Sequence, residues 1–212
     1  MNSRSIQTLT TLFFLFFAIQ SHGQRFATSH RGDFPFKVSL GFNIVDDTFK
    51  NADNFETSSE LNIVPFPSRI SVEGILYEYL SWEGAFSYNK YEAGHLYNGG
   101  QIMEDWDYYS YDANIKFYFG DFLNSPEFFE PYINAGLCHN IIHDKSNAKM
   151  ALGGGFNIWP FENNYDYRLR NRIINRLGFF FQLQGKVAFE NTLSETGEKH
   201  IQAAFGAIYK FR

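Results

Sequence analysis

The chain has 212 residues and a net charge of −5, and its 25 Phe and 13 Tyr make it rich in aromatic residues although only 44% of its residues are hydrophobic. The acidic balance argues against a nucleic-acid partner, which requires a basic surface. The single cysteine, Cys138, excludes an internal disulfide. The length suffices for one domain with a core of its own or for one membrane barrel.

The first 23 residues have the composition of an export signal. Arg4 supplies a positive charge, an apolar run follows over residues 8–20, and Ser21 and Gly23 place small residues at the two positions that a signal peptidase inspects. The run is shorter than the roughly 20 apolar residues that a transmembrane helix needs. We predict a signal peptide over residues 1–23 and a periplasmic lead over residues 24–35.

From residue 36 onward, apolar and polar residues alternate with a period of two, as expected of strands that have two different faces. Eight stretches share this pattern, and in chain order they cover residues 36–45, 68–76, 80–90, 109–119, 132–141, 150–159, 179–190 and 201–212. Each has about the 9–11 residues that a tilted membrane strand needs.

Charged residues fall on the polar face of these stretches. A Lys or Arg on the lipid face costs about 2–4 kcal/mol at the midplane of the bilayer, so the apolar and aromatic face is expected to point outward. Inside a barrel, opposite charges can pair. The residues expected to form a polar network in the barrel interior are Arg69, Glu73, Glu83, Asp112, Lys116 and Lys186.

Eight such strands predict an all-β fold, an antiparallel up-and-down barrel over residues 36–212 that is integral to the outer membrane of a Gram-negative cell. Closure removes the edges of the sheet, and hydrocarbon demands that every backbone group be hydrogen-bonded. The last strand is therefore expected to pair with the first. Its aromatic face needs no covering segment because lipid is its solvent.

The connections differ in length and charge. The first and third are long and polar, as expected of outer loops, and the fifth, residues 142–148, is expected to be of moderate length. The sixth, residues 160–176, is long although it should be periplasmic. Its four arginines are a candidate periplasmic docking site for an acidic partner or anionic headgroups, or else belong to a solvated hairpin: Arg168, Arg170, Arg172 and Arg176.

The end of the chain resembles an assembly signal. Gly206, Tyr209 and Phe211 are spaced as in the C-terminal signal that the barrel assembly machinery recognises. Ala204 departs from that pattern where a polar residue is usual, and so does Arg212, which follows the last aromatic residue.

Four stretches, residues 61–94, 108–119, 128–137 and 151–159, resemble the N-terminal barrel of OmpA-family proteins from Bacteroidetes-type bacteria. The resemblance implies a fold and a location more than an activity. Family members commonly continue into a peptidoglycan-binding domain. The sequence here stops with the barrel, so we expect no cell-wall tether.

We therefore expect a structural or interaction role without enzymatic activity or cofactor, for instance as an accessory subunit of an outer-membrane assembly. The expected partners are outer-membrane lipid, the barrel assembly machinery and another outer-membrane or periplasmic protein. Three alternatives stay open: a small gated, porin-like pore, a soluble lipocalin-like carrier, and a lipid A-modifying enzyme. The enzyme would need a Ser–His pair facing lipid, for which His139 is the one histidine suitably placed. We expect no metal site at His139 and His143, and Cys138 is expected to be a small interior filler.

Overall fold

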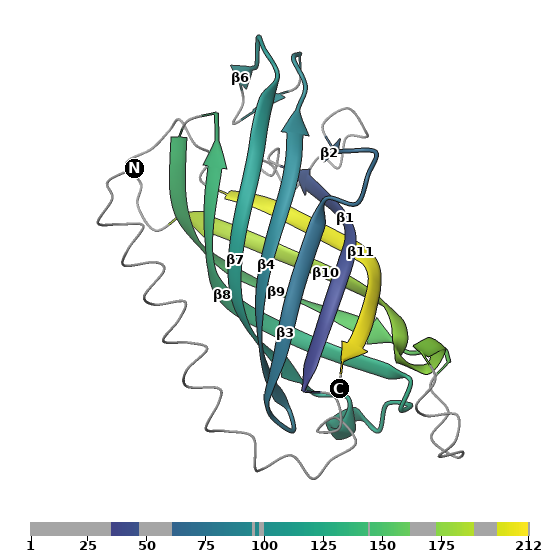
Figure 1. Cartoon of the computed structure of the whole chain (residues 1–212). Helices are drawn as coiled ribbons and strands as arrows, with labels where there is room; N and C mark the ends of the chain where they lie inside the picture. The colour runs from purple at the N-terminus through teal and green to yellow at the C-terminus, as the bar shows by residue number, and fades with distance from the viewer. Residues whose placement is uncertain are drawn as a thin grey trace, which may run out of the picture.

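The structure is a computed structural model that describes residues 35–46, 61–94, 96–97, 100–143, 145–161, 173–188 and 199–211. Eight long strands form a closed antiparallel barrel, as the alternation predicted (Figure 1). No helix in this described part of the chain is long and apolar enough to cross a membrane.

The barrel wall follows chain order, with each long strand pairing antiparallel to its neighbours. The barrel strands are β1 (Phe36–Asp46), β3 (Arg69–Tyr77), β4 (Leu80–Tyr91), β7 (Trp106–Tyr118), β8 (Phe129–Ile142), β9 (Lys145–Ile158), β10 (Leu177–Ala188) and β11 (Lys199–Phe211). The short elements are β2 (Asn62–Ile63), β5 (Leu96–Tyr97), β6 (Gly100–Gln101) and the 3-10 helices η2 (Asp121–Leu123) and η3 (Ile173–Arg176).

Closure of the wall is provided by the first and last long strands. β11 pairs with β1 along the whole length of β1, from Phe36 opposite Phe211 to Asp46 opposite Ile201. Every long strand therefore has a hydrogen-bonded neighbour on both sides, which a hydrocarbon environment requires.

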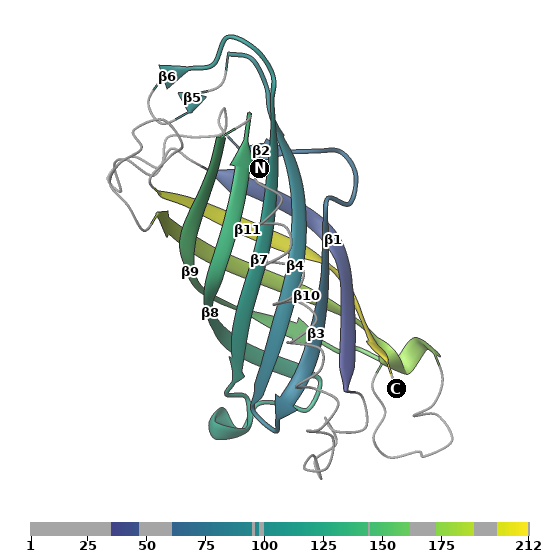
Figure 2. The ribbon, with the colours of Figure 1, turned by 60° about the vertical axis from the view of Figure 1, so that its left-hand side comes forward.

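The two ends of the barrel differ (Figures 1 and 2). At the end where β11 stops, here called the C-terminal end, lie the β3–β4 turn, the β7–β8 connection with η2, and η3. At the opposite end, β4 and β7 extend beyond the other strands and carry β5 and β6; this is the hairpin end.

The connection between β8 and β9 corrects one expectation. β8 continues to Ile142 and β9 begins at Lys145, so a tight turn replaces the moderate loop expected over residues 142–148. The two strands continue past the segments in which apolar and polar residues alternate, and the sequence pattern therefore underestimates their length.

The two faces of the wall separate as expected from their residues. Outward side chains are apolar and exposed, for example Leu40 at 52%, Leu137 at 58% and Leu152 at 69%. Trp82 also lies on this face but is only 7% exposed. Its indole lies against Gly74 of β3, where an added Cβ would be 2.2 Å from Trp82 Nε1.

At the hairpin end, the side-chain amide of Asn89 links β4 to β1 and β2 in place of backbone hydrogen bonds. β3 begins only at Arg69, and the Asn89 side chain of β4 donates to the carbonyls of Asn43, at 3.1 Å, and Asn62, at 2.6 Å. Asn89 is fully buried. It therefore ties β1, β2 and β4 together beyond the start of β3.

Replacing Asn89 by Ala is expected to lower the free energy of unfolding by about 1–3 kcal/mol, the cost of leaving buried acceptors without a donor. Urea unfolding in phosphatidylcholine vesicles measures this change. Ser146→Ala, at an exposed position of β9, is the matched control and should leave the midpoint unchanged. Equal midpoints for the two variants would show that the amide bridge contributes nothing to stability.

Candidate functional site: a filled and charged barrel interior

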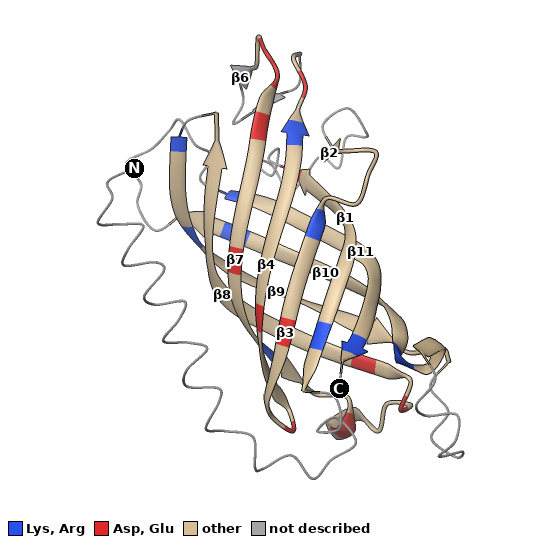
Figure 3. Ribbon diagram, viewed as in Figure 1, with Lys and Arg blue, Asp and Glu red and all other residues tan. Residues whose placement is uncertain are grey.

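Nine charged side chains from seven strands form a chain of alternating sign through the barrel interior, which we call the charge ladder. Figure 3 shows where Lys, Arg, Asp and Glu lie along the strands. From the hairpin end to the C-terminal end the members of the charge ladder are Lys186, Asp112, Arg69, Glu83, Lys116, Glu73, Lys37, Glu130 and Lys210. Cations and carboxylates follow one another without a break, so each interior member has an opposite charge on both sides.

The ion pairs of the charge ladder are close. The tightest are Lys186 Nζ to Asp112 Oδ1 at 2.5 Å and Lys116 Nζ to Glu83 Oε2 at 2.6 Å. Arg69 bridges two carboxylates, at 3.2 Å from Asp112 and 3.1 Å from Glu83. The longest step, 3.9 Å between Lys210 and Glu130, lies at the C-terminal end.

Neutral groups also donate hydrogen bonds to the carboxylates of the charge ladder. Glu73 accepts hydrogen bonds from the Tyr118 hydroxyl at 2.5 Å and the Ser81 hydroxyl at 3.0 Å, and Glu83 accepts one from the Asn114 amide at 3.1 Å. Buried charges are tolerated when they are both paired and hydrogen-bonded. The carboxylates Glu73, Glu83 and Asp112 meet both conditions.

All six residues that the sequence assigned to the interior network lie in the charge ladder, and it brings them into one connected chain. The sequence-based set lacked Lys37, Glu130 and Lys210. The period of two places Lys37 and Lys210 on inward faces, so that signal was present. Glu130 precedes the predicted strand over residues 132–141, whereas β8 already begins at Phe129.

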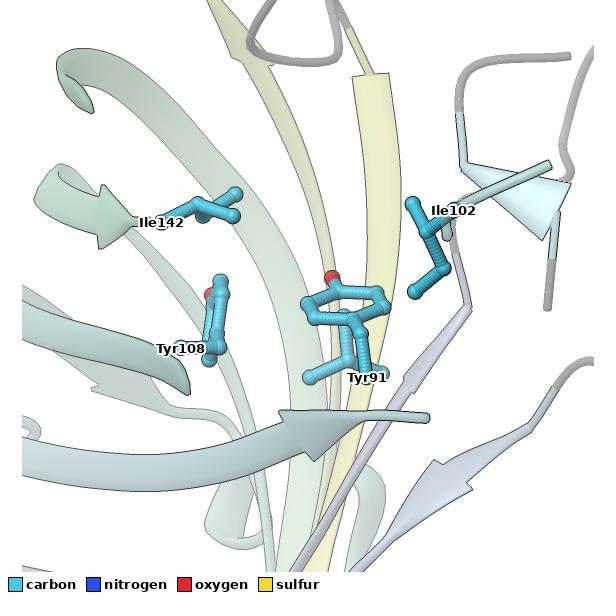
Figure 4. Packing of buried hydrophobic residues seen from close by; sticks show 5 residues of the cluster. Tyr91, Ile102, Tyr108 and Ile142 are labelled. Atoms are coloured by element: carbon cyan, nitrogen blue, oxygen red, sulfur yellow. The ribbon is translucent and has the colours of Figure 1, made fainter. Parts of the chain in front are cut away.

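Buried hydrophobic side chains form a cluster at the hairpin end (Figure 4). This cluster consists of Val45, Tyr91, Ile102, Tyr108 and Ile142. Ile102 comes from the β4–β7 connection and faces Tyr91, and the rings of Tyr91 and Tyr108 meet edge to face with centroids 5.9 Å apart. The β4–β7 connection thus contributes a side chain that packs over the mouth of the barrel.

A second apolar cluster lies inside the wall toward the C-terminal end. It consists of Trp159, Phe180, Ala204 and Ile208. The ammonium group of Lys210 lies 3.9 Å from the centroid of the Trp159 ring, close enough for a cation–π contact. The last cation of the charge ladder is therefore held by an aromatic face as well as by Glu130.

Next to the hairpin-end cluster, Lys149 and Tyr108 hold the buried His200 from two sides. Lys149 Nζ lies 2.9 Å from His200 Nδ1, and an ammonium group can only donate. The proton of the neutral imidazole is therefore assigned to Nε2, which donates to the Tyr108 hydroxyl at 3.2 Å. These residues extend the polar interior beyond Lys186.

The exposed hairpin at this end has a salt bridge of its own. Lys90 Nζ lies 2.7 Å from Asp105 Oδ2, and the backbone N–H of Ala93 donates to Asp105 Oδ1 at 2.9 Å. These hydrogen bonds hold the pKa of Asp105 below its usual value of 3.8. The contact is fully present above that pH and is lost as the pH falls through the lowered pKa.

The histidine and cysteine candidates lie apart from one another. Cys138 faces inward and is 3% exposed. His139 is exposed on the outer face, where its cross-strand neighbours are Tyr111 and Ala148 rather than a serine. His143 lies in the β8–β9 turn with φ of 42° and stacks on Trp106. Among the described residues, no group of three or more His, Cys, Asp or Glu could hold a metal ion.

The arginine-rich connection and the assembly signal are the remaining predicted sites, and the structure describes part of them. Arg176 lies in η3, whereas Arg168, Arg170, Arg172 and the signal peptide lie outside the described residues. The predicted assembly signal lies on β11. There Gly206 faces Gly41 of β1, and the rings of Tyr209 and Phe211 meet edge to face at 4.8 Å.

Comparison with known proteins agrees with this geometry. No protein-family model and no curated protein matches the chain. Neisserial surface protein A matches with a TM-score of 0.51 at 13% identity, over 83% of this chain and 96% of that one. Outer membrane protein AlkL, whose structure was solved in DMPC lipid bilayers, matches with a TM-score of 0.50 at 10% identity, over 84% and 90%. The fold is that of the outer-membrane β-barrels.

At these identities the likeness concerns the fold alone. The barrel also has the two faces that lipid requires, because its apolar residues point outward and its charges point inward. A lipocalin-like carrier would need an apolar cavity. The charge ladder occupies the place of such a cavity, so the carrier alternative does not fit the structure.

Proposed function

We propose that this protein is an integral outer-membrane barrel with a structural or interaction role, and that its interior is a plug rather than a pore. The observation that carries the proposal is the charge ladder. Its nine members are between 0% and 6% exposed. A water-filled channel along the axis would leave such side chains accessible to solvent.

The outer face supports the membrane location. Leu, Ile, Val, Met and Phe side chains that are 37–69% exposed lie on the outward face of the wall, among them Ile133, Leu137, Met150, Leu152, Phe179 and Phe181. A soluble monomer rarely exposes a contiguous apolar patch larger than a few hundred Å². Lipid is the solvent in which such a surface is stable.

The resemblance of residues 61–94 and 108–119 to OmpA-family barrels supports membership of that family. We propose no catalytic role; the residues directly opposite His139 on the two neighbouring strands are Tyr111 and Ala148. An acidic periplasmic protein remains the proposed partner for the arginine-rich connection, with Arg176 at its edge. Deleting residues 162–172 while the barrel still folds should abolish crosslinking to that partner.

The decisive experiment combines heat-modifiable gel mobility with conductance. A washed outer-membrane fraction should contain the protein, and its unheated band should migrate faster than the boiled band. In planar bilayers the purified barrel should show no unitary current steps, with a general porin as the positive control. A soluble protein without a mobility shift would overturn the membrane location. Reproducible current steps would instead establish the pore alternative.

A further inference from the structure

The β7–β8 connection presents two large apolar side chains at the C-terminal end of the barrel. Phe122 is 64% exposed and Leu123 is 63% exposed, and both belong to the 3-10 helix η2. Phe128, which closes the same connection, is 50% exposed. Exposed apolar side chains gathered on a turn indicate a contact with something other than water.

Backbone hydrogen bonds fix the shape of this turn. The N–H groups of Leu123 and Ser125 donate to the Gly120 carbonyl at 3.1 and 3.0 Å, and that of Asn124 donates to Asp121 at 3.3 Å. Asn124 ends η2 in the left-handed conformation with φ of 51°, which an asparagine tolerates well. The backbone that carries Phe122 and Leu123 therefore has a fixed shape, and both side chains are exposed on it.

The outer wall of the barrel continues directly into this turn. The Phe122 ring stacks on Phe117 of β7, with centroids 6.0 Å apart, and lies 5.1 Å from the ring of Tyr79 in the β3–β4 turn. Phe117 points outward and is 39% exposed. Phe122 thus extends the apolar outer surface past the end of the strands and does not cover the lumen.

We propose that η2 is a lipid-binding wedge in which Phe122 and Leu123 insert at the boundary between acyl chains and headgroups of the leaflet at the C-terminal end. The proposal rests on the proposed membrane location of the barrel. Its occupant is a phospholipid because the patch is continuous with the lipid-facing wall. Asp121, exposed in the first turn of η2, places a negative charge beside the patch, which favours zwitterionic over anionic headgroups.

Site-directed spin labelling tests the wedge. Cys138 is the chain's single cysteine and is 3% exposed, so Cys138→Ser, or Cys138→Ala where serine impairs folding, gives a background without reactive thiols. A nitroxide is attached at Leu123→Cys in the folded barrel in phosphatidylcholine vesicles. Its collision rates with oxygen and with a water-soluble nickel chelate then report its depth in the bilayer.

Two further labels calibrate the measurement. Leu152→Cys, on the outward face of β9, marks the bilayer interior, and Met103→Cys, 87% exposed beyond the hairpin end, marks water. The Leu123 label is expected to be shielded from nickel and accessible to oxygen, at a depth between the two references. A Leu123 label as open to nickel as Met103, while Leu152 stays shielded, would overturn the wedge but keep the membrane barrel.

The remaining outcomes are also decisive. Shielding of the Leu123 label from both reagents would mean that protein rather than lipid covers η2, which contradicts the wedge. A Leu152 label open to nickel would overturn the membrane location itself.

Discussion

Replacing Asp112 by Asn is expected to lower the free energy of unfolding by about 3–5 kcal/mol, the cost of removing one partner from a buried ion pair. Lys186 is wholly buried, and Asp112 is its one carboxylate partner among the described residues. The substitution leaves the Lys186 ammonium with the Ser110 hydroxyl, 2.9 Å away. Urea unfolding in phosphatidylcholine vesicles, followed by tryptophan fluorescence, measures the loss.

A double variant tests whether the lost stability comes from the unpaired charge. Asp112→Asn combined with Lys186→Met removes both charges and should recover most of the lost stability, since Arg69 still pairs with Glu83. Lys90→Met, which breaks an exposed salt bridge, is the matched control and should move the midpoint little. Equal losses for Asp112→Asn and Lys90→Met, or no recovery in the double variant, would contradict a stabilising role for the charge ladder.

Gly206→Ala is expected to prevent closure of the barrel. A Cβ at this position would lie 2.3 Å from the Leu40 carbonyl oxygen and 2.4 Å from Gly41 Cα, both backbone atoms of β1. Overpacking commonly costs about 1–3 kcal/mol. Here no side chain can move aside, so we expect that cost to be exceeded and the fast-migrating folded band to be lost after refolding into vesicles.

Refolding into vesicles also separates an effect on the contact between β1 and β11 from an effect on recognition by the assembly machinery, because that machinery is absent from the vesicles. Gly185→Ala is the matched control: its Cβ would point outward, with the nearest atom 3.9 Å away, and the variant should fold like the unmodified chain. If Gly206→Ala folds in vesicles but fails only in cells, the residue acts in recognition and not in the contact between β1 and β11.

The wall of the barrel was predictable because lipid and interior impose opposite demands on alternate residues. That rule placed Arg69 and Glu83 inside and required β11 to meet β1, as the structure has it. It could not pair the charges, since pairing depends on the stagger between strands that are distant in sequence. Lys37 and Glu130, for example, are 93 residues apart.

Apolar residues of the interior are harder to recognise in the sequence than charged ones. Phe180 lies inside although Phe179 and Phe181 on either side face outward, and a run of three phenylalanines does not reveal its phase. Ile102 lies beyond the predicted strands, and Trp159 is the last residue of the predicted strand over residues 150–159, one residue past the observed end of β9. Ile102 packs inward from a connection, which no periodicity governs.

The sequence distance between partners in the charge ladder constrains how this protein enters a bilayer. Lys186 and Asp112 are 74 residues apart, and Lys37 and Glu130 are 93 apart. A hairpin that crossed hydrocarbon before these distant strands arrived would carry charges such as Lys37 and Lys186 without those partners, at several kcal/mol for each ion. Insertion of strands one after another is therefore unfavourable, and translocation of the chain has to be concerted with closure. The paired charges that stabilise the finished barrel thus raise the kinetic barrier to its formation. Insertion without assistance should therefore be slow.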